Sequence, residues 1–404
     1  MGYAPFPADI PCGILFPMKE KILFLYLDTG GGHRGPARIL SEELESRYGD
    51  ELSVESLNGF SQKQHIARLF FETGYRLACT YLPAAYSLFY DLTTLPPALH
   101  CTKALCSWRT VPFLEKYIRE RGITKVVTFH FVVAPAAVRA IRRVNPAIPF
   151  LIVVTDPFTV HPSWFLARDQ HFIVYTEALK EEIIRTYGIP AERITVMPFV
   201  LDRRFLSPVP APDIAGLKEK YQTAGHERLV LVTGGGDGLK GMVQLVRYFL
   251  EQKAGFGIIA VCGHDEGAQR RLEKLAMRFP GAGLKVFGFV PFMDELIRIS
   301  DCVVTKAGAS KMMEVLACRK PLIISTFIHG QERGNVRFVT ENGSGWFLRT
   351  PAAIYERITR LFGDPAYERN ILSNLEKLCP PNEGHLPSDA SELSAFIRDF
   401  QGKV

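Results

Sequence analysis

The chain has 404 residues, more than one compact core usually holds, which predicts two domains. Its 47% hydrophobic and 22% charged content excludes collagen, coiled coil and wholesale disorder, and a net charge of +6 is too small to indicate nucleic acid as a partner. The same mild positive charge is compatible with anionic phosphates or an anionic membrane surface.

No apolar run reaches the roughly 18 residues that a membrane-spanning helix needs. Residues 1–17 lack the basic start of a secretory signal and are expected to be a disordered leader or an upstream start, which favours a cytoplasmic address. Eight cysteines occur without a C-x-x-C pair, which argues against a zinc site and a disulfide framework. No metal site is expected.

Short buried-type apolar runs alternate with amphipathic stretches, the pattern of parallel sheets covered by helices on both faces. In the first half, strands are predicted at 22–27, 126–129, 150–154 and 172–175, with helices at 36–48 and 135–144. In the second half, strands are predicted at 229–232, 257–261, 284–287, 302–305 and 321–324, with helices at 241–252, 269–278, beyond 363 and at 388–400.

A proline-rich stretch separates the two cycles. Three prolines in 207–213 interrupt both helix and sheet, so this stretch is the predicted hinge. The expected domains are 18–206 and 214–380, followed by 381–404, which is expected to form a helix able to pack back on the N-terminal domain. Two facing doubly wound domains predict a ligand in the cleft between them.

The first predicted strand runs into Asp28-Thr-Gly-Gly-Gly-His-Arg34 and then into a helix that is predicted to begin at Pro36. Three glycines at a strand-to-helix turn expose backbone N–H groups and leave no side-chain bulk, so a ligand can approach the helix N-terminus. His33 would lie at this helix N-terminus. A tight helix entry without a ligand is the alternative.

A second loop of the same build, Thr233-Gly-Gly-Gly-Asp-Gly238, follows the first strand of the second domain. Neither loop has the spacing of a P-loop or of the G-x-G-x-x-G fingerprint, which disfavours a P-loop kinase and a standard dinucleotide oxidoreductase. Paired glycine loops facing each other across a cleft suit a nucleoside diphosphate with an attached group.

A third cluster begins with Lys306-Ala-Gly-Ala-Ser-Lys311, continues into a helix that contains Glu314, and ends in His329-Gly-Gln-Glu-Arg-Gly-Asn335. A small-residue turn at a helix N-terminus binds phosphate through N–H groups and the helix dipole. A glutamate one turn further along can accept hydrogen bonds from two vicinal hydroxyls, as a ribose requires. Alternatively, Glu314 is a solvated residue on an otherwise apolar helix.

Taken together, these motifs resemble the motif series of the monogalactosyldiacylglycerol synthase and processive diacylglycerol glucosyltransferase family. That family is related to the GlcNAc transferase of peptidoglycan lipid intermediates. The similarity runs in order from about Lys21 to Leu348. It is carried by Asp28-Thr-Gly-Gly-Gly-His-Arg34, Thr155-Asp-Pro-Phe-Thr-Val-His-Pro-Ser-Trp-Phe165, Gly234-Gly-Gly-Asp-Gly238, Gly288-Phe-Val290, Lys306-Ala-Gly308, Glu314 and the 330–335 stretch.

The resemblance implies an α/β GT-B fold of two facing Rossmann-like, doubly wound domains. It further implies a UDP-sugar donor, UDP-galactose or UDP-glucose, in the C-terminal domain. The N-terminal domain would handle diacylglycerol or a related lipid, as a peripheral protein on the cytoplasmic face of a membrane. Transfer in the family is inverting and metal-independent, and the donor is a substrate, so no cofactor is expected.

Carried over residue by residue, the resemblance implies that His33 is the base. Asp156 and Asp28 are the carboxylates expected near the reacting atoms. Gly31, Gly32 and Trp164 join His33 on the acceptor side. The implied donor-binding residues are Gly234, Gly235, Gly236, Gly308 and Ser310 along the diphosphate, Phe289 and Val290 beside the uracil, Glu314 on the ribose, and Gln331 and Glu332 on the hexose. Lys306 and Asn335 are further implied donor-binding residues.

One position departs from the family pattern. Where relatives usually carry threonine, this chain has Lys311, which would point its charge at the β-phosphate or into solvent. The substitution bears on donor selectivity more than on the fold.

Residues 61–120 contain ten aromatic residues, and seven Lys or Arg against four Asp or Glu. This composition suits an interfacial amphipathic surface, although aromatics that simply cover the first sheet would give the same counts. The residues concerned are Phe70, Phe71, Tyr75, Tyr81, Tyr86, Phe89, Tyr90 and Trp108, with Arg68, Arg76, Lys103 and Arg109.

Two other functions remain open on the same fold. One is transfer to a different lipid or to a non-lipid acceptor. The other is a sugar-nucleotide-binding or epimerising protein that keeps the cleft without transferring. His33 and the aromatic segment favour transfer to a lipid, whereas Lys311 is the feature that could favour the rivals.

Overall fold

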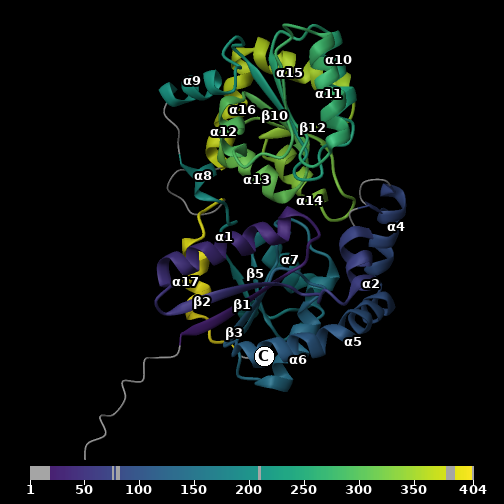
Figure 1. Ribbon diagram of the computed structural model, residues 1–404, viewed down its shortest axis with the longest axis vertical. Coiled ribbons are helices and arrows are strands. Elements are labelled where there is room, and N and C mark those ends of the chain that lie inside the picture. The colour runs from purple at the N-terminus through teal and green to yellow at the C-terminus, as the bar shows by residue number, and fades with distance from the viewer. Residues whose placement is uncertain (1–18, 75–76, 79–81, 208–210, 379–386, 403–404) are drawn as a thin grey trace, which may run out of the picture.

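Two parallel β-sheets with helices on both faces build the molecule (Figure 1). The computed structural model describes residues 19–74, 77–78, 82–207, 211–378 and 387–402, so the predicted leader 1–17 lies outside the described residues. The N-terminal strands are β1 (Glu20–Tyr26), β2 (Leu52–Asn58), β3 (Lys125–Thr128), β4 (Phe150–Val153), β5 (His171–Val174) and β6 (Ile194–Val196). The C-terminal strands are β7 (Leu229–Thr233), β8 (Gly257–Val261), β9 (Leu284–Phe287), β10 (Cys302–Lys306), β11 (Leu322–Thr326) and β12 (Gly345–Phe347).

The strand order is β2-β1-β3-β4-β5-β6 in the first sheet and β12-β11-β10-β7-β8-β9 in the second. All neighbouring strands are parallel. Runs such as Phe150–Val153 are buried along their whole length, as a sheet covered on both faces requires. The predicted fold of two doubly wound α/β domains is therefore confirmed.

Helices connect the strands of each sheet. In the N-terminal domain they are α1 (Gly31–Tyr48), α2 (His65–Arg68), the π-helical η1 (Leu69–Gly74), α4 (Pro83–Thr93), α5 (Pro96–Arg121), α6 (Ala134–Val144) and α7 (Glu177–Tyr187), with 3₁₀ turns η2 (Pro162–Phe165) and η3 (Ala191–Arg193). The remaining helices are α8 (Arg203–Leu206), α9 (Ala211–Lys220), α10 (Met242–Glu251), α11 (Glu266–Arg278), α12 (Met293–Ile299), α13 (Ala309–Ala317), α14 (Arg333–Glu341), α15 (Pro351–Gly363), α16 (Pro365–Leu378) and α17 (Ser391–Asp399). Within the described ranges, no helix is long and apolar enough to cross a bilayer.

Several predicted element boundaries differ from the structure by a few residues, and two of these concern the first glycine motif and the hinge. Helix α1 begins at Gly31 rather than Pro36, because the glycines form its first turn and the helix tolerates the proline at the cost of one hydrogen bond. Helix α9 begins at Ala211, inside the predicted hinge 207–213, since a proline fits the first turn of a helix. Residues 208–210 of that hinge lie outside the described residues.

The chain returns to the N-terminal domain at its end. Helix α17 packs against α1, and its last carbonyls are capped by a buried lysine of β3. Lys125 Nζ donates to the carbonyls of Ile397 (2.9 Å) and Arg398 (2.6 Å) and lies 3.1 Å from Glu20 Oε1. A cation at a helix C-terminus satisfies free carbonyls and opposes the dipole, which fastens α17 to the first sheet.

Candidate active site

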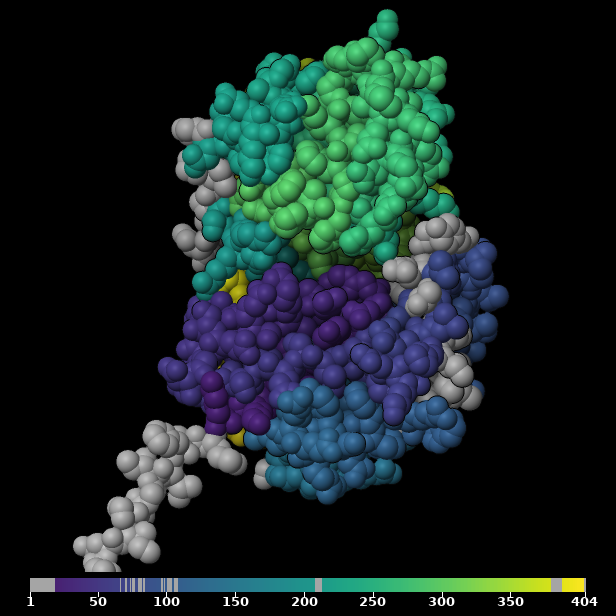
Figure 2. Space-filling model, viewed as in Figure 1, coloured from purple at the N-terminus to yellow at the C-terminus, as the bar shows by residue number. Residues whose placement is uncertain are grey.

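The predicted motifs meet at the carboxyl edges of the two sheets. In the first sheet, β1 and β3 are neighbours, and in the second β7 and β10 are neighbours. At each of these points the strand order reverses, and the loops that leave the strands diverge to form a crevice. Figure 2 shows the recess between the domains, with the purple α1 segment along its lower border.

The first glycine loop lies at the start of α1. Gly30 is the N-cap residue, with a φ of 128° that favours glycine. Gly31 and Gly32 are exposed, and a Cβ at either would have no atom within 4 Å. The start of α1 therefore carries no side-chain bulk and is exposed at both glycines, which is compatible with the predicted approach of an acceptor.

His33 is buried at the mouth of this helix and held by one ring nitrogen. Nδ1 lies 2.8 Å from the carbonyl oxygen of Phe129 and 2.8 Å from Oγ1 of Thr155. Because a carbonyl only accepts, Nδ1 carries the proton, and the lone pair of the neutral ring resides on Nε2. Burial lowers the pKa of His33, while the charge of Asp156 and the Phe129 carbonyl oppose that shift. The lowered pKa favours the neutral ring, and Nε2 has no hydrogen-bond partner among the described residues.

Asp156 joins the two domains. Its Oδ2 accepts from the Trp164 indole at 2.9 Å, and its Oδ1 accepts from the Gln331 amide of the C-terminal domain at 3.2 Å. Burial raises the pKa of Asp156, and His33 and these two donors oppose the rise. Trp164 was predicted on the acceptor side, but it is fully buried, so it reaches an acceptor only through Asp156.

Asp28 is exposed and belongs to a separate group of polar residues. Its Oδ2 accepts from Asn58 at 3.2 Å, its backbone N–H donates to Glu72 at 3.2 Å, and Arg34 lies 3.8 Å from Oδ1. Among the described residues, these are its polar partners, and His33 is not one of them. Within the described residues, Asp28 thus has no hydrogen bond or ion pair with His33 or Asp156, and its predicted role stays a prediction.

Two buried histidines near His33 received no role from sequence. The His130 ring lies 4.4 Å from that of His33, and burial holds the pKa of His130 well below its ordinary value. The His161 ring packs edge-on against Tyr90 at 4.7 Å, and burial lowers the pKa of His161 to about 4. The signal that could have found His130 is its place directly after a predicted strand, at the carboxyl edge of the sheet.

The second glycine loop follows β7. A Cβ at Gly234 would collide with the backbone of Gly238, so the tight turn itself requires glycine. The carbonyl of Gly236 accepts from the His264 N–H at 2.8 Å. The His264 ring stacks on the Phe289 ring at 4.6 Å and 7°, and Phe289 is 63% exposed. An exposed aromatic face beside this loop suits a nucleobase; Val290 is half-buried next to it.

The third cluster opens helix α13. Gly308 is its N-cap residue, and Ser310 is half-buried in the first turn. Lys311 forms an ion pair with Glu314, and the two side chains are only 14% and 17% exposed. Lys311 therefore does not point into solvent, and Glu314 is not a solvated residue.

The loop after β11 completes the donor side. Glu332 is buried and accepts from the Ile328 N–H at 2.7 Å; burial raises its pKa, and the charge of Lys306 opposes this. Asn335 donates to the carbonyl of Ala307 at 2.7 Å, whereas its buried Oδ1 has no partner among the described residues. These two side chains hold the loops, whereas Gln331 reaches Asp156.

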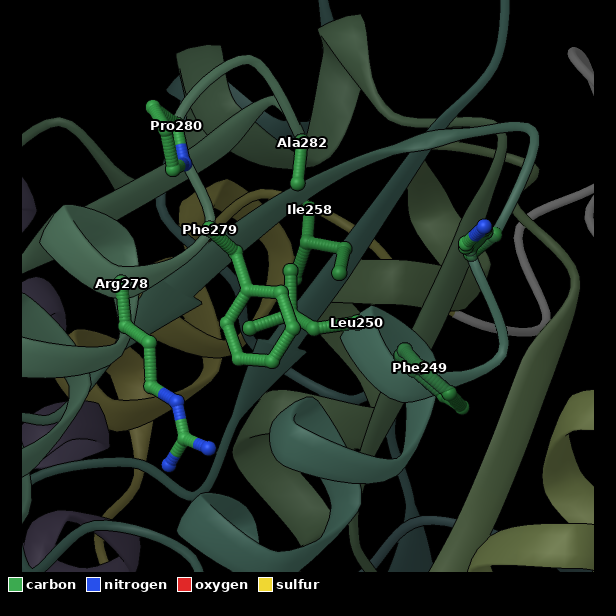
Figure 3. Close-up of a pocket in the computed structure, with 9 residues that line it drawn as sticks. Phe249, Leu250, Ile258, Arg278, Phe279, Pro280 and Ala282 are labelled. Carbon is green, nitrogen blue, oxygen red and sulfur yellow. The ribbon is translucent and has the colours of Figure 1, made fainter.

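A separate pocket lies at the other end of the C-terminal domain. It encloses about 400 Å³, and Lys253, Ile258, Arg278 and Phe279 are among its lining residues (Figure 3). Its lining comes from the carboxyl ends of α10 and α11, the loops that follow them and the start of β8, opposite the sheet edge that carries the glycine loops. It therefore takes no part in the candidate active site.

Comparison with known proteins covers both domains. Residues 33–199 match the family described as monogalactosyldiacylglycerol (MGDG) synthase, and residues 229–367 match the glycosyltransferase family 28 C-terminal domain. Monogalactosyldiacylglycerol synthase 1, chloroplastic, of Arabidopsis thaliana is 27% identical over 394 residues, 91% of this chain and 70% of that protein.

Two solved structures share the fold. Acinetobacter baumannii MurG has a TM-score of 0.60 at 14% identity, covering 94% of this chain and 100% of that one. UDP-GlcNAc 2-epimerase from Neisseria meningitidis has a TM-score of 0.57 at 13% identity, covering 94% and 99%. Fold alone therefore does not separate transfer from epimerisation, but the two sequence matches do. The chain is therefore a glycosyltransferase, in which a segment similar to the MGDG synthase family precedes a glycosyltransferase family 28 C-terminal domain.

Proposed function

We propose that this glycosyltransferase moves galactose or glucose from a UDP-sugar to diacylglycerol at a membrane surface. The observation that carries the proposal is the fixed tautomer of His33. Its Nδ1 is bound to the Phe129 carbonyl, and among the described residues Nε2 has no hydrogen-bond partner. His33 lies in the first turn of α1, the helix that contacts α13 across the cleft.

In the proposed reaction, Nε2 of His33 takes the proton of the acceptor hydroxyl, and the hydroxyl oxygen attacks the anomeric carbon. The bond between that carbon and the β-phosphate oxygen breaks, and its electron pair leaves with UDP. Attack from the face opposite UDP inverts the anomeric centre. Asp156 stabilises the imidazolium that forms, and the N–H groups of the 234–236 loop and of α13 stabilise the departing diphosphate.

We propose that the transfer needs no metal ion. The sequence lacks an Asp-x-Asp pair to bridge a cation to the diphosphate. Backbone N–H groups at a helix N-terminus can bind the diphosphate in place of a cation.

Exposed apolar side chains on the 61–120 segment support a membrane surface. Helix α4 presents Leu88 and Leu92 to solvent, while Tyr86 is buried and Tyr90 packs inward against His161. Figure 1 places α4 beside the gap between the domains, next to α14. Eight of the eleven exposed large hydrophobic side chains in the described residues come from this segment: Leu69, Leu77, Leu82, Leu88, Phe89, Leu92, Leu95 and Trp108.

This surface differs from the one predicted from aromatic residues. Leucines dominate it, and Phe71 and Tyr86 instead pack inward, as the alternative reading expected. The side chains of Phe70, Tyr75, Tyr81, Arg76 and Lys103 lie outside those that the structure describes. A leucine face beside the mouth of the cleft suits a peripheral protein with a lipid acceptor, and we propose the cytoplasmic face of an anionic membrane as its site.

The decisive experiment offers radiolabelled UDP-galactose and UDP-glucose to the full chain with diacylglycerol or ceramide in vesicles containing anionic lipid, in EDTA. We expect a glycolipid from diacylglycerol with an inverted anomeric centre. Transfer to ceramide or to a water-soluble acceptor instead would mean that the enzyme uses another class of acceptor. Interconversion of UDP-sugars without transfer would establish the epimerising alternative, and dependence on added Mn²⁺ or Mg²⁺ would refute metal independence.

A further inference from the structure

The Lys311–Glu314 ion pair lies on α13, the helix whose N-terminus is the proposed diphosphate site. Lys311 is the third residue of that helix. A cation in the first turn opposes the helix dipole, which favours negative charge there. Lys311 is therefore poorly placed for helix stability unless an anion accompanies it, and in this structure Glu314 is that anion.

The surroundings of the pair limit its access to water. The Lys311 ammonium lies 6.0 Å from the centre of the Phe205 ring of α8. Arg204, also on α8, has a raised pKa, mainly because it binds Asp202 and to a smaller extent because the charge of Glu314 lies across the interface between α8 and α13. The Lys311 and Glu314 side chains are only 14% and 17% exposed. If one of them moves away, water therefore replaces the lost ion-pair partner of the other only in part.

We propose that Lys311 is a donor-specificity residue that exchanges one anionic partner for another when the donor binds. Its ammonium leaves Glu314 for the diphosphate, and Glu314 then accepts the two ribose hydroxyls. This inference rests on the proposed UDP-sugar donor. The exchange is favourable only when both parts of the donor arrive, because ribose alone separates the pair and leaves Lys311 without an anion.

The exchange predicts coupling between the ribose and the diphosphate. Uridine must break the ion pair without offering Lys311 a replacement, so its binding is penalised. UDP supplies a partner to each side chain, and a lysine acts on phosphate as a point charge without strict geometry. Lys311 therefore raises the affinity for UDP while it lowers the affinity for uridine.

Titration calorimetry with UDP and with uridine tests this coupling in the wild type, in Lys311→Met, and in the double variant Lys311→Met/Glu314→Gln. The double variant has no unpaired charge, so it covers the case in which the single variant does not fold. We expect the ratio of UDP affinity to uridine affinity to fall by about tenfold or more in both, the usual scale for a hydrogen bond to a charged group. Uridine alone should bind Lys311→Met as tightly as the wild type or more tightly.

Lys253→Met is the matched control, since it removes one lysine from the same domain at the distant pocket of Figure 3 and should leave the ratio unchanged. An unchanged ratio in the Lys311 variants would overturn the exchange, as would equal losses for UDP and uridine. Failure of the wild type to bind UDP is a different result, which refutes the proposed donor itself.

Discussion

His33 depends on a contact that spans 96 residues of sequence. The Phe129 carbonyl at the end of β3 fixes the Nδ1 proton, and Thr155 after β4 lies against the same nitrogen. Three adjacent strands of one sheet therefore orient a single imidazole. Pre-organisation of this kind lets the free nitrogen act without a rearrangement during the reaction.

Replacing His33 by alanine should cut turnover by about 10²–10⁴, the usual value of general-base assistance. UDP affinity should barely change, because the donor site belongs to the other domain. Three measurements on this variant separate a base from a structural cap: turnover, UDP affinity and melting temperature. Removal of a structural cap would lower all three. His171→Gln, at the opposite side of the same domain beside Phe396, serves as control. Near-normal turnover would reassign the base role.

The pH dependence of activity should reflect the lowered pKa of the buried His33. A base must be unprotonated, so activity falls as pH drops through its folded pKa, which burial holds below the ordinary value of 6.5. The acid limb of kcat/KM should therefore lie below pH 6.5. Asp156→Asn removes the charge that raises this pKa, so the limb should move to still lower pH. A limb that moves upward in this variant would contradict the pairing.

At the scale of elements, α4 has two faces with different tasks. Tyr90 and Thr93 approach His161, and the Tyr90 ring packs on Gly330, whereas Leu88, Leu92 and their neighbours face solvent. One helix thereby connects the apolar surface to the mouth of the cleft. A lipid acceptor held at that surface would need to move only a short way to reach the active site.

Leu92→Glu should lower binding to anionic vesicles by about tenfold or more, because burying one leucine in an apolar phase is worth about 1.5–3 kcal/mol. Vesicle flotation measures the effect, and UDP affinity should stay unchanged. Met277→Glu is the matched control, since Met277 is 74% exposed on α11 of the other domain. Equal losses in both variants would mean that α4 has no special part in docking.

The two domains meet through a small contact beside the active site. The Gly334 N–H donates to Oγ1 of Thr159 at 2.8 Å, and the Phe158 and Phe338 rings stack at 4.0 Å. Gln331 reaches Asp156 from the same loop. This contact places the loop proposed to bind the hexose beside Asp156, one of the two proposed catalytic residues.

Gly334→Ala tests how much the reaction depends on this contact. Its new Cβ would collide with the Thr159 side chain and the Phe158 backbone, so the loop must retreat from Asp156. We expect a loss of about 1–3 kcal/mol in unfolding free energy, typical of overpacking, together with lower turnover. Gly216→Ala, where the added Cβ meets no atom within 4 Å, should leave turnover unchanged. Unaltered turnover in Gly334→Ala would show that the contact is dispensable.

The sequence by itself determined the fold class and indicated where the candidate site lies. Short, fully apolar runs such as Phe150–Val153 that alternate with amphipathic stretches are typical of strands buried on both faces, and glycine turns after such strands mark the carboxyl edge of a parallel sheet. The sequence pattern did not predict β2, whose seven residues are mostly half-buried and partly polar. Nor did it predict the three-residue strands β6 and β12. Their strand geometry depends more on neighbouring strands than on their own pattern.

Only the tertiary structure decided what each site residue touches. Periodicity and spacing report local conformation, whereas the partners of a side chain come from distant segments. The free nitrogen of His33 follows from a carbonyl on another strand, and the burial of Trp164 places it behind Asp156. Lys311 and Glu314 are near in sequence, yet their pairing follows from packing against α8, which excludes much of the water that would otherwise separate two charges.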